Sequence, residues 1–159
     1  MTLTFFDGMF LFIAILLNVL ISIIFIARYR GPEELEHKIG YIVIACAIPL
    51  ALILVNYILI GAEIWIIIYV VIIIGFLIVE TILDYILKLD FRTNLKIVVP
   101  FVIFYYIAFW GLLAISFVIN LVFGFIVFGA FMISIVITIY THKKDQDRMT
   151  LKKEDQTSD

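Results

Sequence analysis

Three ionisable side chains recur at a spacing of four residues in one apolar part of the chain: Glu80, Asp84 and Lys88. Residues four apart lie on one face of an α-helix, so these three form a ladder along that face. Carboxylates inside an apolar span are costly and are functional candidates by default. Asp84 lies close enough to Lys88 to pair with it, whereas Glu80 lies about 12 Å deeper than Lys88 along the helix. The two carboxylates can attract a cation, take up a proton or serve in acid–base chemistry.

Polar side chains in three other apolar stretches fall at a similar depth, between four and ten residues from the His, Lys or Arg that bounds each stretch. They are Asn18, Ser22, Tyr105, Ser134 and Thr138. Several belong to rows of small and polar residues spaced by four, which is typical of helix faces that contact other helices. We predict that these faces converge with Glu80 and Asp84 on an acidic pocket open toward the cytoplasm. The alternative is an ordinary packing seam, with Glu80 hydrogen-bonded to Tyr105 or Ser134.

The remaining reactive residue types are scattered. His37 and His142 lie among charges, and the single cysteine, Cys46, lies in an apolar stretch. The sequence therefore predicts no metal site, no intrachain disulfide and no cofactor site. Ser116 and Ser134 lack both a glycine-framed nucleophile motif and a histidine base. The basic residues are interleaved with acids and match no nucleic-acid-binding motif. An enzyme, such as an intramembrane lipid-modifying one, is the least favoured class of function.

The elements that carry these residues must lie in a membrane. Hydrophobic residues make up 65% of the 159 residues, charged residues make up 15%, and the mean hydropathy is +1.24. Soluble domains are near half apolar and a quarter charged, and a chain this short has too much surface to bury the excess. The apolar runs are continuous rather than alternating, which disfavours a β-barrel. The predicted fold class is an all-α, polytopic integral membrane protein whose surroundings are the lipid bilayer.

Five uncharged or nearly uncharged runs are long enough to cross the hydrocarbon, which takes about 20 apolar residues. The last run, Ile97–Thr141, would reach roughly 68 Å as one helix, so it must fold back. Polar and flexible residues place that turn around Asn120. The predicted spans, joined by short loops, are 5–27, 39–61, 64–87, 97–118 and 121–140. They form a transmembrane domain over residues 1–141, followed by a charged cytoplasmic tail over residues 142–159.

Charge placement predicts the orientation of the spans. With five spans, all 11 Lys and Arg residues fall on one side, in the first loop, the third loop and the tail, whereas the other side carries only Asp7 and Glu63. Basic residues near span ends are retained in the cytoplasm. We therefore expect a multi-pass protein of the cell membrane with its N-terminus outside and its C-terminus in the cytoplasm. Four or six spans would divide the basic loops between both sides.

Three local features carry further expectations. Pro49 lies in the middle of the second span, where it removes a backbone donor and predicts a kink. Pro32 and the acidic residues after it predict the start of a helix. The tail mixes charges of both signs without apolar periodicity, so it is expected to be disordered or a short extension of the fifth span.

Two classes of function remain open. In the first, Glu80 and Asp84 attract a small cation, a proton or the amine of an amphiphile or lipid, and the protein binds or transports it. Transport by five spans without inverted repeats would need a homodimer. In the second, the protein is a noncatalytic accessory or structural subunit of a membrane complex. Its carboxylates would then pair with a basic helix of a partner membrane subunit or stabilise its own bundle.

Overall fold

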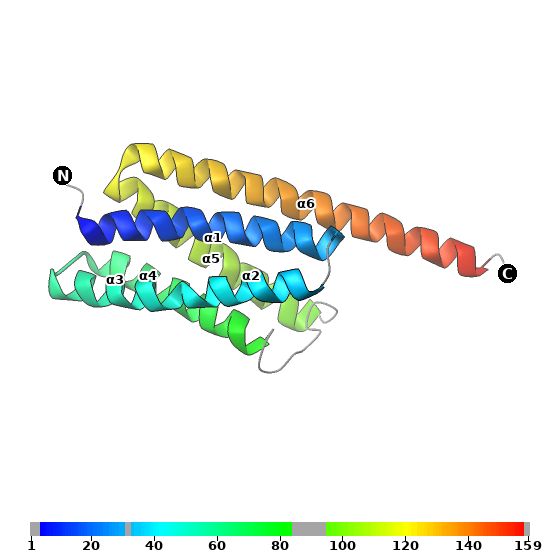
Figure 1. Ribbon diagram of the computed structural model, residues 1–159, viewed down its shortest axis with the longest axis horizontal. Helices are drawn as coiled ribbons and strands as arrows, with labels where there is room; N and C mark the ends of the chain where they lie inside the picture. The colour runs from blue at the N-terminus through cyan, green and yellow to red at the C-terminus, as the bar shows by residue number, and fades with distance from the viewer. Residues whose placement is uncertain (1–3, 31–32, 84–94, 158–159) are drawn as a thin grey trace.

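The structure is a computed structural model that describes residues 4–30, 33–83 and 95–157. Over these ranges the chain is built of helices joined by short turns, without β-strands. The helices are α1 (Phe5–Arg30), α2 (Glu33–Ala45), α3 (Ala47–Leu59), α4 (Ile64–Thr81), α5 (Leu95–Ile119) and α6 (Leu121–Thr157). They form an elongated bundle with their axes roughly along one direction, and α6 extends beyond the other helices toward the C-terminus (Figure 1).

Five stretches of these helices are long and apolar enough to cross a membrane. They are Phe5–Ile24, Lys38–Leu59, Ile64–Thr81, Lys96–Ile119 and Leu121–Tyr140. The predicted fold class, an all-α membrane protein with five spans, is therefore confirmed. The predicted third span continued to residue 87. In the structure α4 ends at Thr81, and residues 84–87 lie outside the described residues.

The second span consists of two helices, because α2 and α3 meet at Cys46. Pro49 has no N–H to donate to the carbonyl of Ala45, so the regular hydrogen-bond ladder is interrupted one turn before the proline. At the junction the Cys46 N–H still reaches the carbonyl of Ile42 at 3.2 Å. The junction between α2 and α3 thus lies three residues before Pro49, and a kink of the span stays a prediction. The helix start predicted after Pro32 also agrees with the first residue of α2, Glu33.

The turn between α3 and α4 depends on Gly61. This residue has a φ angle of 67°, a left-handed conformation that side chains with a Cβ rarely adopt. The turn closes when the Ala62 N–H donates to the carbonyl of Tyr57 at 2.9 Å, as in a glycine-ended helix C-terminus. Glu63 then precedes the first residue of α4.

The turn between α5 and α6 is centred on Asn120, as predicted. Its Oδ1 atom accepts hydrogen bonds from the N–H groups of Val122 at 2.9 Å and Phe123 at 3.3 Å, and so caps α6. The two helices approach each other closely just after this turn. A Cβ on Gly124 would lie 2.8 Å from the Cα atom of Phe117, so only glycine fits there without a shift of the backbone.

The five crossings give the bundle two chemically different ends. The start of α1, the α3–α4 turn and the α5–α6 turn lie together at one end, and the starts of α2 and α5 lie at the other (Figure 1). We call the first the acidic end, because Asp7 and Glu63 lie there, and the second the basic end, where Lys38 and Lys96 lie. Among the described residues, the segments that form the acidic end contain no Lys or Arg.

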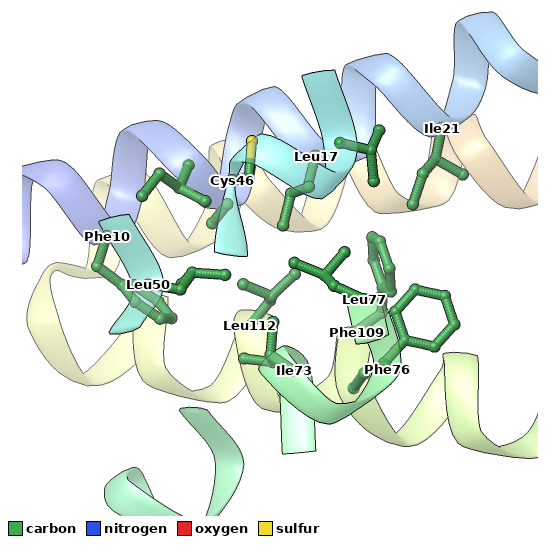
Figure 2. Packing of buried hydrophobic residues seen from close by; sticks show 14 of the residues in the cluster. Phe10, Leu17, Ile21, Cys46, Leu50, Ile73, Phe76, Leu77, Phe109 and Leu112 are labelled. Atoms are coloured by element: carbon green, nitrogen blue, oxygen red, sulfur yellow. The ribbon is translucent and has the colours of Figure 1, made fainter. Parts of the chain in front are cut away.

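Helix α1 is the central helix of the bundle. It packs on α2, α3, α5 and α6, and 56% of its apolar stretch is buried, against 22% for α4 and for α6. Its inner face meets residues of the surrounding helices in one apolar core (Figure 2). Labelled members of this core are Phe10, Leu17, Ile21, Leu50, Ile73, Phe76, Leu77, Phe109 and Leu112. The outer faces of the same helices expose large apolar side chains, as lipid-facing surfaces do.

Helix α6 is the longest helix, with 37 residues. Its apolar stretch ends at Tyr140, and the helix continues to Thr157, roughly 25 Å further along its axis. The tail was expected to be disordered or a short extension of the fifth span. The structure agrees with the second of these alternatives, and the helical extension is longer than expected. An α-helix already formed in the membrane supplies the nucleus that a charged segment lacks on its own.

Candidate functional site

The polar side chains predicted on the first and fifth spans meet in the structure. Ser22 on α1 and Ser134 on α6 are buried, with 7% and 0% of their surface exposed, and their hydroxyl oxygens are 2.6 Å apart. Both hydroxyls also lie within hydrogen-bond distance of the Asn18 carbonyl oxygen, at 2.8 Å from Ser22 and 3.1 Å from Ser134. We call this contact, with Thr138, the α1–α6 polar seam.

The spacing of four residues explains how the seam assembles. Small residues one turn away allow the two helices to approach closely. Other polar groups of the seam bond within their own helices, because the Asn18 amide donates to the carbonyl of Ala14 at 2.8 Å and the Thr138 hydroxyl to the carbonyl of Ser134 at 2.8 Å. The Asn18 Oδ1 atom is buried without a hydrogen-bond partner among the described residues.

Glu80 lies near the basic end of the bundle, at the second-to-last position of α4. Its side chain is partly exposed, but its Oε2 atom is buried. Glu80 lies about 24 Å along the helix axis from Ile64, the first residue of α4. This distance is shorter than the thickness of a bilayer core, which is about 30 Å. Tyr105 on α5 packs against the same helix, because its ring contacts that of Phe76, four residues before Glu80. A hydrogen bond between Glu80 and Tyr105 or Ser134 stays a prediction.

Aromatic rings connect this carboxylate region to the rest of the bundle. The ring of Tyr105 lies 5.6 Å from that of Phe76 on α4 and 4.4 Å from that of Phe109 on α5. Phe109 in turn stacks on Phe131 of α6 at 6.1 Å. These contacts form a continuous aromatic row from α4 across α5 to α6, with Tyr105 as its polar member.

The predicted site residues thus form two groups on different helix interfaces. Asn18, Ser22, Ser134 and Thr138 lie between α1 and α6, whereas Glu80 lies on α4, which packs on α2, α3 and α5. Asp84 lies outside the described residues. That the two groups share one pocket open toward the cytoplasm stays a prediction.

One interaction at the acidic end was not singled out from the sequence. The Tyr57 hydroxyl on α3 donates to Asp7 Oδ1 on α1 at 3.1 Å, across 50 residues of sequence. The other oxygen, Oδ2, accepts from the Thr4 N–H at 3.1 Å and from the Thr4 hydroxyl at 2.6 Å. A threonine followed three residues later by an acid is a helix-capping pattern, which could have drawn attention to Asp7. No sequence signal points to Tyr57 as its partner.

The described residues offer no metal centre, because no group of three or more His, Cys, Asp or Glu side chains in these ranges is arranged to hold a metal ion. Comparisons with protein families, with curated proteins and with solved structures find no match for this chain. Its function must therefore be argued from the geometry.

Proposed function

We propose that this multi-pass membrane protein binds a small cation, a proton or the amine of an amphiphile or lipid at Glu80, from the side of the membrane where the basic loops lie. The observation that carries the proposal is a carboxylate inside a membrane span with one oxygen, Oε2, buried in the bundle. Ionisable groups inside membrane spans cost free energy and often mark ion, proton or ligand sites, which supports binding at Glu80.

The depth of Glu80 supports access from the basic end. At about 24 Å from the start of α4 it lies only a few ångströms inside the hydrocarbon boundary. Asp84 follows Glu80 by four residues in the sequence, and we include it in the proposed site as a second carboxylate. Of the proposed ligands, a proton demands least of the geometry, because it needs no cavity of its own. Transport, as opposed to binding, would need a second copy of the chain.

The α1–α6 polar seam favours a second candidate, a noncatalytic accessory or structural subunit. The hydroxyls of Ser22 and Ser134 use their hydrogen bonds inside the bundle, as a packing seam does. In such a subunit Glu80 would pair with a basic helix of a partner membrane protein, and the seam would hold the bundle together.

Variants at Glu80 separate these candidates. Glu80→Gln keeps the shape of the side chain and removes its charge, whereas Glu80→Leu also removes its polarity. For a proton, infrared spectra of the full chain in lipid should show a carboxylic acid band that titrates and is absent from Glu80→Gln. For a cation or amphiphile, native mass spectrometry from detergent should show an adduct that both variants lose.

Other results decide against binding at Glu80. If both variants fold and show the same bands and masses as the unmodified chain, Glu80 binds no ligand. If native mass spectrometry instead shows a second membrane protein that both variants release, the accessory function is supported. The same spectra report whether the chain forms a homodimer.

A further inference from the structure

A cavity of about 340 Å³ opens at the acidic end of the bundle, far from Glu80. It lies between the first turn of α1, the α3–α4 turn, the first turn of α4 and the last turns of α5. Ile115 and Tyr57, both buried, line its inner part, whereas Gly61 and Glu63 at its rim are exposed. The volume falls within the range of small-molecule sites. The cavity is therefore large enough for a small organic molecule and is bordered by an exposed turn.

The wall of this cavity holds a fixed carboxylate. Asp7 is oriented by three hydrogen-bond donors, namely the Tyr57 hydroxyl and the N–H and hydroxyl groups of Thr4. Helix capping accounts for the two bonds from Thr4, but the bond from Tyr57 comes from another helix and joins α1 to α3 beside the cavity. Because three donors already fix the orientation of the Asp7 carboxylate, less conformational entropy is lost when a ligand binds it.

A second carboxylate lies at the rim. Glu63 lines the cavity on its exposed side and accepts a hydrogen bond from Trp65 Nε1. The described segments that form this end of the bundle, residues 4–10, 57–66 and 115–124, contain no Lys or Arg. Within these segments Asp7 and Glu63 therefore give the cavity a negative potential, and such a potential attracts cations.

The rest of the lining is apolar and determines which cation fits. Ile60, Ile66, Ile115, Val118 and Ile119 contribute hydrocarbon surface to the cavity. A bare metal ion needs several oxygen ligands around it, which such walls do not supply. An organic cation with a charged head group and a short hydrocarbon chain matches both the carboxylates and the apolar walls. Its head group pairs with the carboxylates, while its chain displaces water from the walls.

We propose that the acidic-end cavity is a binding site for a small alkylammonium ion, with Asp7 pairing with the ammonium group and Glu63 attracting it at the rim. This site is separate from Glu80, lies at the opposite end of the bundle and does not depend on the function proposed above. If the expected orientation holds, it faces the outside of the cell, so the ligand enters from there.

The two tryptophans of the chain allow a direct test. Trp65 is bonded to Glu63 at the rim, whereas Trp110 is 59% exposed on the outer surface of α5. In a Trp110→Phe background, Trp65 is the only tryptophan and reports on the cavity. The full chain is placed in nanodiscs of phosphatidylcholine, which carries no net charge, and titrated with hexylammonium. Neutral 1-hexanol serves as the control for partition into lipid, and sodium as the control for a bare cation.

We expect a saturable change in Trp65 fluorescence with hexylammonium and none with 1-hexanol or sodium at the same concentrations. Asp7→Asn should weaken binding at least tenfold. Glu63→Gln should weaken it only a few-fold, because an exposed charge is screened by salt. Ala62→Phe fills the cavity without changing its charge and should abolish binding. If Asp7→Asn does not fold, this variant tests whether hexylammonium binds in the cavity.

The proposal is overturned if hexylammonium gives no saturable response or the same response as 1-hexanol or sodium. It is equally overturned if folded Asp7→Asn and Ala62→Phe chains bind hexylammonium within twofold of the unmodified affinity. Variants at Glu80 should leave this titration unchanged, so failure here and failure at Glu80 are distinguishable.

Discussion

Ser22 and Ser134 join the first and last membrane spans through hydroxyl oxygens 2.6 Å apart, although 112 residues separate them in the sequence. Ser134 also reaches the backbone carbonyl of Asn18, so one residue of α6 contacts two groups on α1. Apolar faces alone do not select partners in a bilayer, because lipid tails are as apolar as the side chains. This polar contact therefore contributes to the choice of α6 as a neighbour of α1.

The contact predicts a measurable coupling between the two serines. Ser22→Ala and Ser134→Ala should each destabilise the folded chain by about 1 kcal/mol, and their coupling in a double-mutant cycle should be roughly 0.5–1.5 kcal/mol. The measurement is reversible unfolding in bicelles. Ser116→Ala is the matched control, since Ser116 is also buried but donates only to the Leu112 carbonyl of its own helix; paired with Ser22→Ala it should show no coupling. A Ser22–Ser134 coupling near zero would show that the contact adds no stability.

The α5–α6 turn predicts opposite effects of the same substitution at two glycines of α6. A Cβ on Gly124 would meet the Phe117 backbone, whereas a Cβ on Gly129 has nothing within 4 Å. Gly124→Ala should therefore destabilise the chain by about 1–3 kcal/mol through overpacking. Gly129→Ala should be neutral or stabilise it by up to about 1 kcal/mol, because alanine favours the helix. Unfolding under one set of conditions compares the two; equal effects would contradict the close approach of α5 and α6.

The charge distribution predicts the orientation in the cell membrane. In a Cys46→Ala background, Leu121→Cys places a thiol at an exposed position of the acidic end, and Thr157→Cys places one at the end of α6. A membrane-impermeant maleimide should label the first in intact cells and the second only after permeabilisation, because basic loops are retained in the cytoplasm. The reverse pattern would mean that the acidic end faces the cytoplasm, and the proposed ligand sites would exchange sides.

Much of the fold follows from local properties of the chain. The length of each apolar run specifies a span, because a helix must cover about 30 Å of hydrocarbon with its backbone bonds satisfied internally. Asn120 marks the turn between α5 and α6 because its side chain caps a helix, and Pro49 marks the break in the second span because it has no N–H. The spacing of four also predicted that Ser22 and Ser134 face other helices.

The bundle alone determined which of these faces meet. Nothing in the order of residues indicated that α1 would be the central helix, that Ser22 would face Ser134 or that Tyr57 would donate to Asp7 beside a cavity. Spans, caps and breaks depend on neighbours a few residues away, so one sequence is enough to predict them. Pairing among five similarly apolar spans depends on the fit of their surfaces in space, and that fit exists only once the chain has packed.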